Sequence, residues 1–114
     1  MLNLIECASF EHLREYISPA EMLAQLAEES AELAQAALKL RRALDGTNYT
    51  PKSVEDCKRC FFEEIADINV CISALIHAGF KLDYSYIYRM EAGKAARWEA
   101  RLKHLRGGEN SENS

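Results

Sequence analysis

The sequence predicts an all-α protein, organised as a four-helix-type bundle that is completed by oligomerisation. The composition favours helices, because 48% of the residues are hydrophobic and the chain holds only two prolines and five glycines. Apolar residues recur at helical spacing along two long segments, and no segment alternates as a half-buried strand does. The 114 residues suffice for one domain, which we expect over residues 1–106, before a flexible polar tail at residues 107–114.

The first long helix is predicted from Ser18 to Leu44 or Asp45. Ser18 and Glu21 form a capping box, in which each side chain bonds the backbone N–H of the other residue, and a proline takes the first helical position. Gly46 follows, and glycine readily adopts the left-handed conformation that ends many helices. Both ends of this helix are therefore marked in the sequence.

The second long helix is predicted to start near Pro51 or Ser53, after a polar connection at residues 47–50, and to end at Gly79. The third begins around Asp83 and ends at Leu105 or Arg106, because two consecutive glycines follow. A shorter helix over residues 5–16 precedes the first long one.

Composition also excludes several classes of protein. The net charge of −4 argues against non-specific nucleic-acid binding, which needs a basic face. No export signal and no apolar run of membrane-spanning length is present, so we expect a cytoplasmic protein without membrane contact. Four cysteines in that setting indicate reduced thiols, and the CxxC of Cys57 and Cys60 lacks the second pair that a zinc site requires.

Two pairs of carboxylates carry the functional signal. Glu29 with Glu32, and Glu64 with Asp67, are each three residues apart, so each pair shares one face of its predicted helix. Two neighbouring negative charges destabilise a helix unless a cation neutralises them. Hard divalent cations bind carboxylate oxygens and commonly bridge them to substrate phosphates. The pattern predicts metal-assisted phosphate chemistry, although acidic pairs also occur on solvated helix faces.

Helical periodicity places each acidic pair beside an apolar stripe. The stripes consist of Leu26, Leu33, Ala37, Leu40 and Leu44 on the first helix, and of Phe61, Ile65, Ile68, Ile72, Leu75 and Ile76 on the second. If the two helices pack antiparallel through these stripes, the four carboxylates converge at the flank of the bundle. Each unpaired charge there costs desolvation free energy, and a bound metal would remove that cost.

The segments Leu26–Leu33 and Glu63–Ile68 resemble the EExxE and ExxD motifs of the MazG-like nucleotide pyrophosphohydrolases, within the all-α NTP pyrophosphatase superfamily. The resemblance extends over roughly Ser18 to Leu102. It implies hydrolysis of a nucleoside or deoxynucleoside triphosphate between its α and β phosphates, giving a nucleoside monophosphate and pyrophosphate. The base and the sugar are left open.

The resemblance also assigns residues. Glu29, Glu32, Glu64 and Asp67 match the family's Mg²⁺ ligands, with Mn²⁺ as a substitute cation. Glu28 is a weaker assignment, as a further residue of the metal shell that acts with Glu29 in catalysis or orients the attacking water. No covalent nucleophile is needed, because phosphoryl transfer depends mainly on charge neutralisation and alignment.

Further candidates lie outside the two motifs. Lys94, Arg97 and Arg101 share a face of the third helix and match a basic segment that approaches substrate phosphates, although a solvated helix face would look the same. Asn69 is predicted either to read the sugar or base or to bond a neighbouring helix. Lys39 either pairs with Glu32 or reaches a phosphate, and we favour the ion pair.

The apolar area is too large for one solvent-exposed layer, so we expect a homodimer or homotetramer. Two other functions stay open. One is a catalytically inactive helical module that binds a nucleotide or a protein on the same scaffold. The other is a phosphoribosyl-ATP pyrophosphohydrolase, which shares the chemistry.

Overall fold

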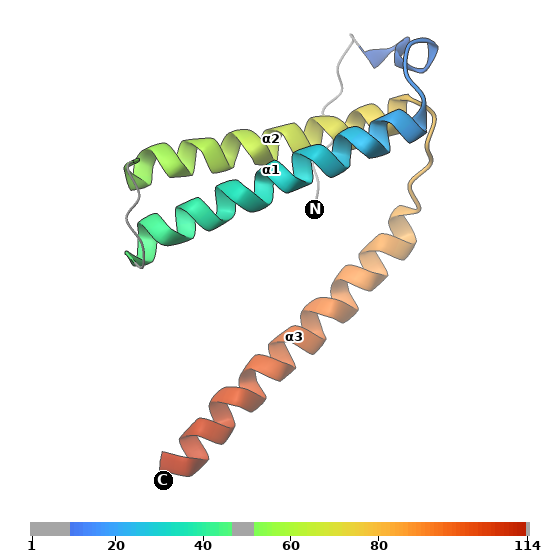
Figure 1. Ribbon diagram of the computed structural model, residues 1–114. Helices are drawn as coiled ribbons and strands as arrows, with labels where there is room; N and C mark the ends of the chain where they lie inside the picture. The colour runs from blue at the N-terminus through green and yellow to red at the C-terminus, as the bar shows by residue number, and fades with distance from the viewer. Residues whose placement is uncertain (1–9, 47–51, 114) are drawn as a thin grey trace. The chain divides into compact units, whose positions relative to one another are not determined.

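The computed structural model describes residues 10–46 and 52–113, with side chains up to residue 107. Over these residues the chain forms η2 (Leu13–Glu15), α1 (Pro19–Asp45), α2 (Val54–His77) and α3 (Tyr84–Asn113), without a strand (Figure 1). The all-α class is therefore confirmed. The chain divides into two units, Met1–Lys81 and Leu82–Ser114. No described helix combines the length and the apolarity that crossing a membrane requires.

Helix α1 has the ends that its sequence predicts. The Ser18 hydroxyl accepts a hydrogen bond from the Glu21 N–H at 3.1 Å, and the Glu21 carboxylate accepts one from the Ser18 N–H at 3.1 Å. At the other end, Gly46 adopts φ 66° and its N–H donates to the Arg42 carbonyl at 2.9 Å. A side chain at this φ would be strained, which explains the glycine.

Helix α2 begins at Val54, and the Ser53 hydroxyl caps it by accepting from the Asp56 N–H at 3.2 Å. Of the two predicted starts, Ser53 is the observed one, while Pro51 and the connection at 47–50 lie outside the described residues. The helix ends at His77, and Gly79 follows with φ 110°, a conformation that favours glycine.

Helix α3 begins as predicted, with the Asp83 carboxylate accepting from the Tyr86 N–H at 3.0 Å. The predicted end at Leu105 or Arg106 is wrong, because the backbone stays helical to Asn113. Glycine in a helix interior costs only about 1 kcal/mol relative to alanine. Each further residue of a formed helix adds a backbone hydrogen bond, so two glycines without a competing cap do not stop it.

The predicted short helix over residues 5–16 is wrong in its described part. Residues 10–16 form turns and 3₁₀ conformation, which includes η2, and residues 5–9 lie outside the described residues. A helix of this length is marginal on its own, so tertiary contacts decide the conformation. Phe10, Leu13 and Ile17 pack on the core of the first unit, and η2 gives them that arrangement.

Helices α1 and α2 run antiparallel, side by side, as the helical hairpin of the first unit (Figure 1). Its core lies where α1 begins and α2 ends, and consists of Met22, Cys71, Ala74, Leu75 and Ala78. Packing against this cluster fixes how the two helices align along their length. The alignment positions the residues of the middle of the hairpin, where the carboxylates lie.

The two predicted apolar stripes form only part of the contact between the helices: Leu75 of the second stripe is buried in the core, and Leu26 of the first stripe packs against it. The buried positions of α1 are Met22 and Ala36, which belong to neither stripe, and those of α2 include Cys57, Cys71 and Ala74 beside Leu75. Leu44 and Ile65, by contrast, keep 62% and 38% of their surface exposed. Most of the buried positions in the two helices are small residues, which allow close approach of the helices, and Met22 and Leu75 are the large residues among them.

Ser18→Ala removes one half of the capping box of α1 and should lower the free energy of unfolding by about 1 kcal/mol. Urea denaturation followed by circular dichroism measures the change. Ser30→Ala is the matched control, since the Ser30 hydroxyl only bonds the Leu26 carbonyl within the same helix, at 2.7 Å. Equal losses for the two variants would contradict a capping role for Ser18.

Candidate metal centre

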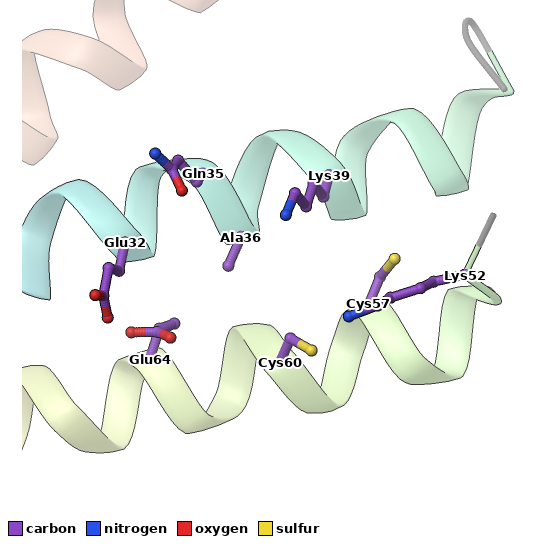
Figure 2. Close-up of a pocket in the computed structure, with 8 residues that line it drawn as sticks. All are labelled: Glu32, Gln35, Ala36, Lys39, Lys52, Cys57, Cys60 and Glu64. Carbon is purple, nitrogen blue, oxygen red and sulfur yellow. The ribbon is translucent and has the colours of Figure 1, made fainter. Parts of the chain in front are cut away.

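Four carboxylates meet between α1 and α2. One oxygen from each of Glu29, Glu32, Glu64 and Asp67 can be chosen so that all lie within 4.8 Å of one another. Glu29 and Glu64 are half-buried, whereas Glu32 and Asp67 are exposed. Figure 2 shows the carboxylates of Glu32 and Glu64 pointing toward one another across the space between the helices. The expected convergence of the four groups is present, and their role as metal ligands stays a prediction.

The acids lie in the seam of the hairpin, in line with buried positions of both helices. Along α1, Met22, Glu29 and Ala36 follow one another at intervals of seven residues, and Met22 and Ala36 are buried. Along α2, Cys57, Glu64, Cys71 and Ala78 do the same, and its cysteines and alanine are buried. Seven residues make almost two turns, so each series follows one side of its helix. In the sequence, this seven-residue spacing is the pattern that indicates that Glu29 and Glu64 face one another.

Two oxygens of the cluster are enclosed without a hydrogen-bond partner among the described residues. They are Oε2 of Glu29 and Oε2 of Glu64. The other oxygen of Glu29 accepts a hydrogen bond from the side-chain amide of Gln25, at 3.0 Å. A buried polar atom without a partner costs free energy, so native proteins leave few of them. Here the unpartnered atoms are acceptors, which a cation would satisfy.

The cluster raises the pKa of both half-buried acids. Desolvation is the main cause for Glu29, and the charges of Glu32 and Asp67 raise its pKa further, while the Gln25 hydrogen bond partly opposes them. For Glu64, desolvation again comes first, followed by the charges of the other three acids. The folded chain therefore disfavours the ionised forms of these two residues. Any cation at this position would be attracted by the same charges.

The cluster matches the donor set of a hard divalent cation. Carboxylate oxygens are its preferred ligands, and Mg²⁺ holds them at about 2.0–2.1 Å, so that opposite ligands are about 4.2 Å apart. The four oxygens lie within 4.8 Å of one another, so small side-chain rotations would bring them onto one ion. The two unpartnered oxygens would gain a partner at the same time. These residues fit the Mg²⁺ that the sequence predicts.

The cysteines near the cluster are thiols. Cys57, Cys60 and Cys71 are free, which agrees with the prediction of reduced thiols, and Cys7 lies outside the described residues. Burial, with the charges of Glu29 and Asp67, raises the pKa of Cys71. Because the thiolate is the reactive form, Cys71 is a poor nucleophile.

A pocket of about 290 Å³ opens beside the acids, toward the turn between α1 and α2 (Figure 2). Its lining combines carboxylates, ammonium groups and thiols, from Glu32, Glu64, Lys39, Lys52, Cys57 and Cys60. The favoured ion pair between Lys39 and Glu32 is absent from the ion pairs that the described residues form. Lys52 was missed by sequence reasoning, since it precedes the cap of α2 and only the fold brings it here.

The other predicted site residues lie elsewhere. Glu28 is exposed on α1 and is not one of the four clustered acids. Asn69 follows Asp67 by two residues, about 200° around α2, so it lies on the opposite side of the helix and is half-buried there. Lys94, Arg97 and Arg101 are exposed on α3, in the second unit, and their contact with phosphate stays a prediction.

Comparisons of this chain with protein-family profiles, with curated proteins and with solved structures find no match.

Glu64→Gln should raise the melting temperature of the metal-free protein at pH 7.5, because it removes one of the crowded negative charges. The raised pKa values mean that the native state binds protons more tightly than the unfolded chain. The stability of the wild type should then fall as pH rises from the ordinary pKa of these acids to the raised one, and the variant should lose part of that slope.

Scanning calorimetry in a chelator, between pH 4 and pH 8, measures both effects. Glu63→Gln is the control, because Glu63 is exposed, adjacent in sequence and outside the cluster. If the melting temperature of Glu64→Gln is lower than that of Glu63→Gln at pH 7.5, charge repulsion is not what lowers the stability of the seam.

Proposed function

We propose that this chain is a Mg²⁺-dependent nucleoside triphosphate pyrophosphohydrolase of the MazG-like type. The observation that carries the proposal is the convergence of four carboxylates within 4.8 Å, contributed by the two segments that resemble the EExxE and ExxD motifs. The unpartnered oxygens of Glu29 and Glu64 support the proposal, because a bound cation would give these two enclosed acceptors a partner.

In the proposed reaction, the oxygen of a water molecule bonds to the α-phosphorus of the triphosphate. The bond between that phosphorus and the oxygen bridging to the β-phosphate breaks, and its electron pair leaves with pyrophosphate. Bound Mg²⁺ supplies the positive charge that the phosphate oxygens require. Glu29, Glu32, Glu64 and Asp67 would hold the cation, and Glu28, exposed next to Glu29, is proposed to orient the attacking water.

Each remaining group has a stated place in this proposal. The cations Lys94, Arg97 and Arg101 of α3 contact substrate phosphates, for which guanidinium groups are well suited. Asn69 lies on the side of α2 away from the acids, so its contact to the sugar or base would require a surface other than the seam. A cysteine nucleophile is disfavoured, since burial keeps Cys71 protonated.

We further propose that a second copy of the chain completes a four-helix bundle, as a homodimer or a homotetramer. Large apolar side chains are exposed on α2, with Phe62 at 61%, Val70 at 40% and Ile65 at 38%. Clusters of exposed apolar surface in a folded chain favour association. Packing of these residues against a second hairpin would bury them and leave the acids of each seam in place.

Static light scattering with gel filtration should therefore give at least twice the 12.9 kDa chain mass at micromolar concentration. Phe62→Asp should shift the equilibrium toward the monomer by placing a charge in the contact. The control Ser85→Asp adds the same single charge at another exposed position. A wild-type mass near that of one chain would contradict the association.

Glu29→Gln and Glu64→Gln should each lower pyrophosphate release from nucleoside triphosphates by at least about 100-fold, because each removes a metal-binding charge. The assay incubates the protein with Mg²⁺ and a panel of ribonucleotides, deoxyribonucleotides and phosphoribosyl-ATP. Glu63→Gln should keep the wild-type rate. In the wild type, Mg²⁺ at 100 times its Kd should add about 2.7 kcal/mol to the free energy of unfolding.

Absence of pyrophosphate release from every substrate would reject the hydrolase. Nucleotide binding without turnover would then favour the inactive binding module. Turnover restricted to phosphoribosyl-ATP would favour the histidine-pathway enzyme.

A further inference from the structure

The pocket beside the acids has two ends of opposite charge. Glu32 and Glu64 lie at one end, next to the rest of the acidic cluster. Lys39 from α1 and Lys52 from the residues before α2 lie at the other end, and Figure 2 shows both side chains reaching into the space between the helices. Two cations from separate segments thus meet in one cavity that also opens onto the acids.

Neither lysine is used by the fold. The ion pairs among the described residues join other partners, so no carboxylate of residues 10–46 or 52–107 is paired with Lys39 or Lys52. Lys58, one turn into α2, shows the contrast, because it pairs with Glu55 at 3.5 Å. Two unpaired ammonium groups that share a pocket repel one another, and an anion between them would remove the repulsion.

The lining indicates which anion fits. No aromatic side chain is among the described residues that line the pocket, whereas sites for nucleobases usually offer apolar or aromatic surface. Phosphate groups need charge and hydrogen-bond donors, and each ammonium group supplies three donors. The pocket therefore suits the phosphate part of a nucleotide and not its base.

We propose that Lys39 and Lys52 bind the β- and γ-phosphates of the substrate, so that the pyrophosphate leaving group lies toward the α1–α2 turn and the nucleoside toward the opposite end of the hairpin. This inference rests on the proposed function and adds the direction of the substrate in the seam. The α-phosphate lies at the acids, where the bond breaks, and the departing pair of phosphates is already held by the lysines.

The test is calorimetric titration of the full chain with inorganic pyrophosphate in the presence of Mg²⁺. The double variant Lys39→Gln with Lys52→Gln should weaken pyrophosphate binding by at least about tenfold, since it removes two charge-assisted contacts. Lys58→Gln with Lys81→Gln is the matched control, because it removes the same charge from outside the pocket and should change the affinity by less than about threefold. Melting temperatures check that both variants fold.

A second titration, with nucleoside monophosphate and Mg²⁺, tests the direction. Its affinity should be the same in the pocket variant and in the control. Equal pyrophosphate affinity in the two double variants would overturn the inference, even for an active hydrolase. A larger loss for nucleoside monophosphate than for pyrophosphate would overturn the proposed direction. Lysine-dependent pyrophosphate binding without any triphosphate turnover would instead support the diphosphate site and reject the hydrolase.

Discussion

Repulsion between four carboxylates in one helix–helix seam is the constraint on which this structure depends. A seam normally gains stability by burying apolar side chains, yet the middle of this one carries Glu29 and Glu64 at positions that small residues occupy elsewhere along it. The cost is tolerated because the helices are held together at one end by the core around Leu75. The middle of the hairpin therefore carries an excess of negative charge, which protonation of Glu29 or Glu64 or a bound cation would relieve.

Both ends of α1 and the starts of α2 and α3 could be read from the sequence because local contacts decide them. Ser18 and Glu21 bond one another three residues apart, and Gly46 meets a conformational need of its own backbone. The pairing of acids along each helix was equally accessible, because it follows from the helical period. Signals of this kind depend on a few neighbouring residues, and tertiary packing did not alter them here.

The arrangement across the helices was harder to predict. Composition favoured contact through the large aliphatic residues, but the buried positions also include the small residues Ala36, Cys57 and Cys71. Hydrophobicity ranks leucine and isoleucine above alanine, so it does not single out these small positions. The seven-residue series could have indicated the contact, because it places the acids and these small residues on the same side of each helix. Lys52 enters the site through the path of the chain, which no local pattern encodes.

The small size of the alanine in this seam would affect which ion the cluster binds. Ala36 is buried between the two helices, next to Glu32 and Glu64. The small side chain of Ala36 allows α1 and α2 to lie close together. The distance between the two helices in turn sets the distance between carboxylate oxygens that face one another. Magnesium requires bonds of about 2.0–2.1 Å, while calcium accepts about 2.3–2.6 Å. The methyl group of Ala36 would thus help the cluster to discriminate between ions by radius, although it binds no ion itself. A larger side chain at this position would favour larger ions.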